Sequence, residues 1–164
     1  MELTVSISTV ISACFGFLGV YVLMPIALIV RDFLILKFIE RYILNDGFWT
    51  ILRIVNTDKA IHNHQFAGKK SQMNISGAGQ CYTIDGREVT ENEYLRFERG
   101  LQMHLNRINQ LEPKILLRTN FIVWADKYFK LESGLMKQID SFSKRVYERE
   151  IRKLKNQDSK APKK

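Results

Sequence analysis

The longest apolar stretch of the chain lies at its N-terminus. Residues 3–30 form a run of 28 positions without a charged side chain. An apolar helix needs about 20 residues, at about 1.5 Å of rise per residue, to cross the hydrocarbon core of a bilayer. The pattern therefore predicts one membrane-spanning helix, and we assign residues 1–30 as a transmembrane anchor.

A core helix of a soluble protein and a cleaved signal peptide also contain apolar runs, but both fit residues 3–30 less well than a membrane span does. The core helix of a soluble protein rarely exceeds about 14 consecutive apolar residues. A cleaved signal peptide begins with basic residues, has an apolar part of about 7–15 residues and ends at a small-residue cleavage site. Residues 1–30 have Glu2 as their only charge and no such cleavage site, so we expect the anchor to be retained.

The next segment, residues 31–55, mixes apolar and charged positions. In a helix over 31–44, one side carries Lys37, Glu40 and Arg41, and the other carries the apolar residues Ile35, Phe38, Ile39, Tyr42 and Ile43. We interpret this segment as an amphipathic continuation at the membrane interface, because each charge at the centre of a second span would cost about 2.5–3.5 kcal/mol.

A turn at 45–47 and a short apolar element at 48–55 complete the interfacial segment. Residues 56–80 are rich in Asn, Gln, Gly, Ser and Lys and have no sustained periodicity. This composition predicts a loop or linker.

The clearest local signal lies between residues 81 and 93. Asp85-Gly86 separates two short β-prone runs, and this pair suits a two-residue hairpin turn that requires positive φ at both positions. Thr90 and Glu93 have the spacing of a capping box, in which each side chain bonds the backbone amide of the other residue. We predict a β-hairpin that leads directly into a helix.

Three helices are expected after the hairpin, because apolar residues recur there at alternating three- and four-residue spacing. The first covers 91–111. Its apolar face includes His104, which we interpret as a hydrogen-bonded core histidine, and Arg107 falls on the opposite, outer face. Pro113 favours the start of a second helix over 114–132. The apolar face of that helix contains Leu117, Phe121, Trp124, Tyr128 and Leu131. The third helix covers 135–155, and the residues from 156 to 164 predict a basic, disordered tail.

These elements together predict a mainly α-helical membrane protein. One N-terminal transmembrane helix is followed by the amphipathic interfacial helix, the small β-hairpin and a three-helix, coiled-coil-like cytoplasmic bundle, the last two forming a unit over 81–155. A core of about 65 residues is marginal by itself. We therefore expect the bundle to rest on the membrane, on a second copy of the chain or on a partner.

Charge gives the anchor a direction. All 25 Lys and Arg residues lie at Arg31 or later, and the portion from Arg31 onward contains 16 Asp and Glu. Basic residues beside a span stay on the cytoplasmic side. The sequence predicts a protein of the cell (inner) membrane with its N-terminus outside and its C-terminal domain in the cytoplasm.

Small residues recur every four positions within the predicted span. Ser8, Ser12 and Gly16 share one helix face, and such faces allow two membrane helices to approach closely. The pattern predicts helix packing with a second copy or a partner span, although serine and glycine are also common in membrane helices that do not associate.

The last predicted helix has a strongly basic face, which consists of Lys137, Lys144, Arg145, Arg149 and Arg152. Contact with acidic membrane lipid, contact with nucleic acid and a solvated face are three interpretations of this pattern. Nucleic acid is the less favoured of the two ligands, because aromatic residues such as Phe142 and Tyr147 fall on the apolar side of the helix instead of among the basic residues.

Residues for catalysis or metal binding are scarce. His62 and His64 would lie on one side of an extended strand, with Cys81 and His104 as the remaining candidates for a zinc site of four ligands. Gly77-Ala78-Gly79 lacks the further residues of a phosphate-binding loop, so a turn explains it. Cys14 and Cys81 lie in different environments and predict no disulfide. We expect neither a catalytic site nor a cofactor.

The expected function follows from the packing surfaces. We expect a non-enzymatic, single-pass membrane protein that binds another membrane or cytoplasmic protein, and so regulates or blocks a process of the cell envelope. A membrane-tethered nucleic-acid-binding protein is one alternative. Another is an exclusion or immunity protein of the kind found in phages and plasmids, an analogy of overall build that no motif supports.

Overall fold

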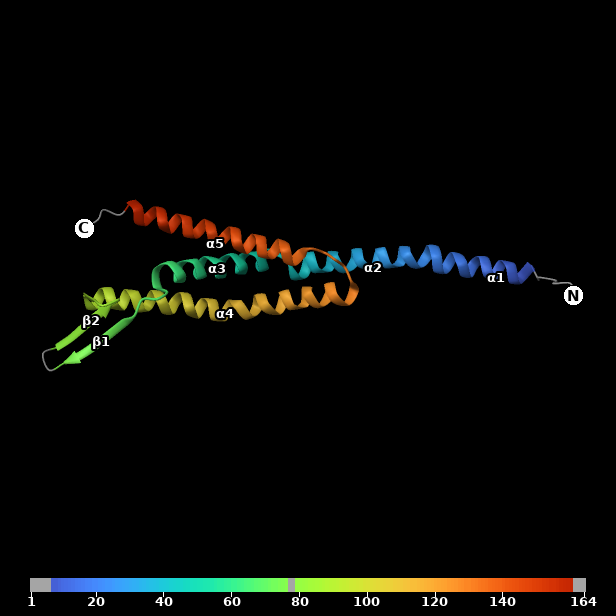
Figure 1. The fold of residues 1–164 in the computed structure, drawn as a ribbon. Helices are drawn as coiled ribbons and strands as arrows, with labels where there is room; N and C mark the ends of the chain where they lie inside the picture. The colour runs from blue at the N-terminus through green and yellow to red at the C-terminus, as the bar shows by residue number, and fades with distance from the viewer. Residues whose placement is uncertain (1–6, 77–78, 161–164) are drawn as a thin grey trace.

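The computed structural model describes residues 7–76 and 79–160 and is mainly helical (Figure 1). The helices are α1 (Ile7–Leu18), α2 (Met24–Phe38), α3 (Asp46–Ile61), α4 (Glu91–Phe129) and α5 (Leu135–Lys160). The strands β1 (Ser71–Ser76), β2 (Gly79–Ile84) and β3 (Arg87–Val89) form one antiparallel sheet in the order β1-β2-β3. Three π-helical turns cover Gly19–Leu23, Ile39–Ile43 and His62–Phe66.

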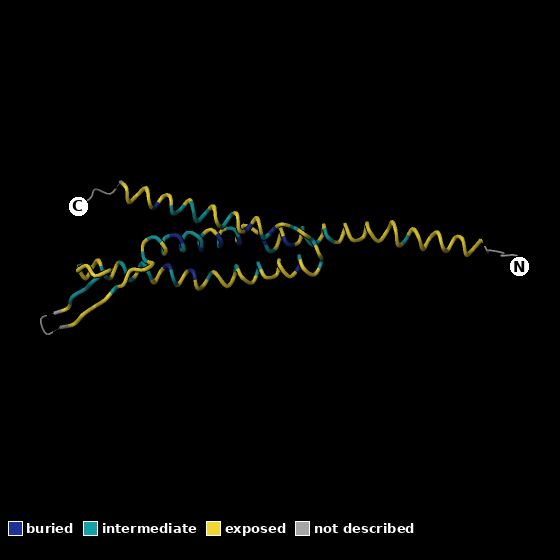
Figure 2. Tube along the Cα trace, in the orientation of Figure 1, coloured by how far each residue is buried: buried dark blue, intermediate teal, exposed yellow. Residues whose placement is uncertain are grey.

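The N-terminal helices join into one helix, Ile7–Ile43, of 37 residues that is long and apolar enough to cross a membrane. Residues 7–30 are exposed, except for the half-buried Gly19, and extend away from the rest of the molecule (Figure 2). Pro25 cannot donate a backbone hydrogen bond, and the wide π-helical turn that ends two residues before it, at Leu23, lets the helix continue.

The helix does continue past residue 30, as expected, and its last part packs against the rest of the chain. Ile39 is fully buried, and Ile35 and Leu36 pack against the same cluster. The expected apolar side also included Phe38 and Tyr42, but these side chains remain 48% and 60% exposed.

Helix α3 corrects the prediction of a short apolar element followed by a loop. Asn45 caps the helix by accepting a hydrogen bond from the Phe48 amide at 3.0 Å. Phe48, Leu52, Val55 and then Asp58 are buried along one face. The expected linker over 56–80 was wrong. His104 and Arg107 bind the Asp58 carboxylate and so let a charged residue continue the apolar face of α3, which hides the periodicity.

The sheet has one strand more than predicted. β1 lies within the expected linker and pairs antiparallel with β2, for example Met73 with Tyr82. The hairpin of β2 and β3 is confirmed, with positive φ at both Asp85 and Gly86. The turn at Gly77 and Ala78 lies outside the described residues.

The capping box at the start of α4 is confirmed. The Thr90 hydroxyl accepts from the Glu93 amide at 3.3 Å, and the Glu93 carboxylate accepts from the Thr90 amide at 3.0 Å. These bonds satisfy two amides that would otherwise lack partners at a helix start.

Pro113 does not begin a new helix, since α4 runs through it as one helix of 39 residues. Buried and half-buried positions follow an unbroken three-four spacing from Tyr94 to Phe129, and the register does not change at the proline: 94, 97, 101, 104, 108, 111, 115, 118, 122, 125 and 129. Packing along this whole face offsets the roughly 3 kcal/mol that an interior proline costs.

The apolar face predicted for residues 114–132 is therefore wrong by one residue. Ile122 and Ala125 are buried, whereas Leu117, Trp124 and Tyr128 are 74%, 51% and 69% exposed. If the three-four pattern is restarted at Pro113, it gives the face that is exposed. If the pattern of the first half of α4 is continued through Pro113, it gives the face that is buried.

The core lies where the end of the N-terminal helix meets α3, α4 and α5. Its buried residues are Ile39, Leu44, Phe48, Leu52, Ile122, Ala125, Leu135 and Ile139. Figure 1 shows α3 running beside both α4 and α5, so these three helices replace the predicted trio. α5 continues to Lys160, which corrects the disordered tail as far as that residue, and 161–164 lie outside the described part.

Candidate functional site

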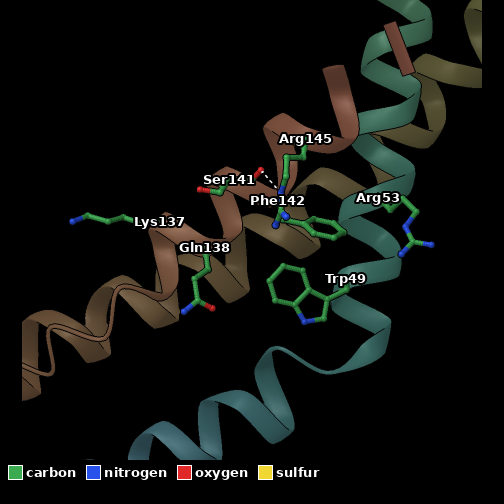
Figure 3. A pocket seen from close by; sticks show the side chains of 7 residues that line it. All are labelled: Trp49, Arg53, Lys137, Gln138, Ser141, Phe142 and Arg145. Carbon is green, nitrogen blue, oxygen red and sulfur yellow. Dashed lines mark hydrogen bonds between the residues drawn. The ribbon is translucent and has the colours of Figure 1, made fainter. Parts of the chain in front are cut away.

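An open groove of about 610 Å³ lies between α3 and α5 (Figure 3). Its floor is aromatic: Trp49 of α3 and Phe142 of α5 meet edge to face, with ring centroids 5.0 Å apart. Both side chains are half-buried. They are placed by the apolar faces of the two helices, which pack against each other here.

The rim of the groove is cationic. Arg53 projects from α3, and Lys137 and Arg145 project from α5, all three exposed. Arg145 donates to the backbone oxygen of Ser141 at 3.3 Å. Within residues 7–76 and 79–160, no carboxylate lies within ion-pair distance of any of these three cations. The groove thus combines unpaired positive charge with an apolar floor, which suits an acidic ligand that also has an apolar part.

The five basic residues singled out from the sequence are all exposed, but they do not form one site. Lys137 and Arg145 belong to the groove, and Lys144 lies in neither concave surface. Arg149 and Arg152 line a second, smaller hollow farther along α5, and Arg145 borders both this hollow and the groove. Arg152 also contacts Glu148 at 3.7 Å. Trp49 and Arg53 were not predicted as site residues, because residues 48–55 were interpreted as part of the membrane interface and not as a helix beside α5.

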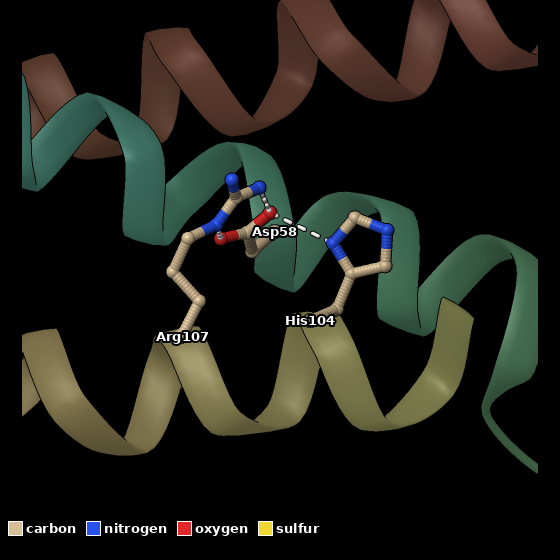
Figure 4. Close-up of polar contacts among 3 residues, drawn as sticks. All are labelled: Asp58, His104 and Arg107. Carbon is tan, nitrogen blue, oxygen red and sulfur yellow. Dashed lines mark hydrogen bonds and ion pairs between the residues drawn. The ribbon is translucent and has the colours of Figure 1, made fainter. Parts of the chain in front are cut away.

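A second polar cluster lies between α3 and α4 and consists of Asp58, His104 and the more exposed Arg107 (Figure 4). The Asp58 side chain is fully buried. Its carboxylate contacts the His104 ring nitrogen Nδ1 at 2.8 Å and accepts from Arg107 Nε at 2.5 Å, with a further hydrogen bond from the Arg107 Nη2 group. The expected hydrogen-bonded core histidine is thereby confirmed.

The partners of Asp58 decide its charge state. Burial by itself raises the pKa of the Asp58 carboxyl, but hydrogen bonds and positive charge from Arg107 and His104 outweigh burial and hold the pKa below its usual value. The same contact raises the pKa of Arg107. The arrangement is a satisfied ion pair that locks α3 to α4. Arg107 was expected on the outer face, and its long side chain reaches back to the carboxylate.

The candidate metal ligands do not come together. His62 and His64 lie in a π-helical turn and not in an extended strand. His64 contacts Asp158 at 3.4 Å, whereas Cys81 lies in β2 beside Glu88. Among the described residues, no group of three or more His, Cys, Asp or Glu could hold a metal ion.

The proposed helix-packing residues lie on the exposed N-terminal helix. Ser8, Ser12 and Gly16 all belong to α1 and are exposed. Apart from its chain neighbours and the backbone of its own helical turns, a Cβ atom added at Gly16 would meet no described atom within 4 Å. This face therefore has room for a close helix partner, and the association itself stays a prediction.

Comparison with known proteins identifies no significantly similar protein. The chain matches no protein-family model, no curated protein and no solved structure at a significant level.

Proposed function

We propose that the chain is a single-span membrane protein whose helical module binds another protein and thereby regulates or blocks a process of the cell envelope, without catalysing a reaction. The observation that carries this proposal is the groove between α3 and α5. It presents Arg53, Lys137 and Arg145 around the Trp49–Phe142 pair, and these features suit an acidic segment of a partner with at least one apolar side chain.

The long N-terminal helix supports the membrane part of the proposal. It is exposed over residues 7–30, and its last turns are fixed in the core of the module. The residues that follow this stretch include Arg31, Lys37 and Arg41, so we place the N-terminus outside and the module in the cytoplasm.

Protein binding explains the basic face of α5 better than lipid binding does. Lys137 and Arg152 are 15 residues apart, which corresponds to about 22 Å along the helix axis. α5 leads away from the N-terminal helix (Figure 1). A lipid surface at Arg31 would therefore not reach Arg149 or Arg152.

A tethered nucleic-acid binder is the second candidate, because the aromatic pair in the groove lies beside Arg145. Bases stack on aromatic and guanidinium surfaces. Binding of single-stranded oligonucleotides to the full chain in micelles, with a strong salt dependence that Arg145→Gln weakens, would favour this candidate. Absence of binding at low salt would remove it.

The main test compares two variants of equal charge. The groove variant contains Arg53→Gln, Lys137→Gln and Arg145→Gln, and the control contains Arg96→Gln, Arg99→Gln and Lys114→Gln on the exposed side of α4. Tagged full-length chains are crosslinked in native membranes and captured. We expect one or a few proteins to be retained by wild type and control and lost from the groove variant. Equal retention by all three would contradict the proposal.

Topology has its own test. We expect a reporter enzyme fused after Lys164 to be active in the cytoplasm and inactive outside the cell. Activity confined to the external compartment would reverse the orientation while leaving the groove unchanged.

Self-association through the anchor is tested with Gly16→Ile. The added side chain fills the open space beside Gly16, so we expect dimerisation in a membrane assay to fall several-fold. Undiminished association would remove this face as a packing surface.

A further inference from the structure

The C-terminal part of α4 carries an exposed aromatic face that no described element covers. Phe121, Trp124 and Tyr128 follow one another along this face, with ring centroids 5.6 Å apart for the first pair and 5.4 Å for the second. Lys127 joins Trp124 and Tyr128 around a shallow hollow of about 440 Å³. We propose that Trp124, Lys127 and Tyr128 insert into the headgroup layer of the membrane, as a second contact beside the span.

The position of this face relative to the N-terminal helix carries the proposal, which rests on the proposed span. Arg31 lies over the Phe129 ring at 5.4 Å and donates to the Phe129 backbone oxygen at 3.4 Å. Arg118 donates to the backbone oxygen of Ile43 at 3.4 Å. α4 therefore runs antiparallel to the last part of the N-terminal helix, and its end returns to the level of Arg31, where the uncharged stretch stops.

Distance along α4 decides which side chains reach the lipid. Trp124 and Leu117 precede Tyr128 by four and eleven residues, which places them about 6 Å and about 16 Å farther from the span. The headgroup layer on each side of a bilayer is about 5–7 Å thick. Tyr128 and Trp124 therefore fall within it, whereas Leu117 lies beyond it although it is the most exposed of the three.

The chemistry of the face agrees with this depth. Tryptophan and tyrosine concentrate at membrane interfaces because each combines an apolar ring with a polar group. Lys127 is exposed between them, and Lys130 follows at the end of the helix; both can contact lipid phosphates. Two contacts, the span and this face, fix the rotation of the module about the span. If a second copy of the chain covered this face instead of lipid, we would expect it to cover Leu117 as well.

The test measures tryptophan fluorescence of the full chain in vesicles of equal phosphatidylcholine and phosphatidylglycerol. The chain has two tryptophans, Trp49 and Trp124. Trp49 is 18 residues beyond Arg31, or about 27 Å along a helix, and should not meet lipid. We expect lipids with a headgroup nitroxide to quench part of the wild-type emission, and this part to disappear in Trp124→Phe.

A matched control places a tryptophan higher on the same face. Leu117→Trp, combined with Trp124→Phe, should give emission that aqueous iodide quenches and nitroxide lipid does not. Equal lipid quenching at positions 117 and 124 would overturn the proposal that lipid contact is confined to Trp124, Lys127 and Tyr128. Shielding of both positions from iodide without lipid quenching would overturn it in favour of a protein partner.

Failure of the span and failure of this contact are separable in the same samples. Resistance of the vesicle-bound chain to alkaline extraction reports the span. An extractable chain would contradict the proposed function, whereas a resistant chain with lipid-independent Trp124 emission would overturn only the aromatic contact.

Discussion

Two groups of cationic side chains lie at the two contacts of α3 with its neighbouring helices, and the groups differ in what neutralises their charge. Arg107 and His104 surround the fully buried carboxylate of Asp58 between α3 and α4. Arg53, Lys137 and Arg145 surround the groove between α3 and α5, with no carboxylate of residues 7–76 and 79–160 in ion-pair range. The first group has its counter-charge within the fold, and the second leaves its charge available to a ligand.

The difference indicates what each group contributes. Removal of one member from a buried, hydrogen-bonded ion pair leaves the remaining groups without partners, so its cost appears in stability. Exposed cations contribute little to stability because water solvates them. Substitutions in the two groups should therefore separate folding from binding.

Asp58→Ala should produce the largest effect. It leaves His104 buried without its partner, and we expect the free energy of unfolding to fall by about 3 kcal/mol. Chemical unfolding of the full chain in micelles, followed by far-UV circular dichroism, measures this change. Arg53→Ala on the same helix is the control and should alter stability by less than about 0.5 kcal/mol. Equal losses in the two variants would contradict the comparison.

Arg107→Lys should have an intermediate effect. Arg107 gives Asp58 two hydrogen bonds from a planar guanidinium, and a lysine ammonium cannot reproduce that geometry. We expect a loss of about 1.5 kcal/mol in the same unfolding measurement. Arg145→Lys in the groove should leave the unfolding free energy unchanged, and a matching loss there would show that the groove cation is structural.

Acid should weaken the buried group selectively. The folded-state pKa of Asp58 lies below its usual value, so the carboxylate stabilises the fold at pH values above its unfolded-state pKa. This stabilisation is lost as the pH falls below about 4 toward the folded-state pKa. Asp58→Asn should reduce the acid dependence of the unfolding free energy. An unchanged dependence would mean that other carboxylates account for it.

The same comparison shows what the sequence could predict. The hairpin turn at Asp85-Gly86, the capping box at Thr90 and the buried histidine at position 104 were predicted because each depends on a few neighbouring residues or on one helix face. Asp58 was missed because its partners are 46 and 49 residues away. Local composition contains no information about contacts at that separation.

Helix α4 illustrates a second limit. The three-four spacing was visible on both sides of Pro113, and the error lay in the assumption that a proline resets it. Two apolar faces coexist in this half of the helix, and only the position of α3 and the N-terminal helix decides that Ile122 is buried and Trp124 exposed. The groove was missed for a related reason, because it requires α3 and α5 to lie side by side.

Neutralisation of the groove should have the smallest effect on folding. Arg53→Gln with Arg145→Gln removes like charges that lie near one another, so stability should rise by a few tenths of a kcal/mol or stay the same. Unfolding at low and high salt measures this, and the gain should vanish in about 1 M salt, where screening acts over about 3 Å. A loss of stability that salt does not remove would mean that these cations hold α3 and α5 together, as Arg107 holds α3 and α4.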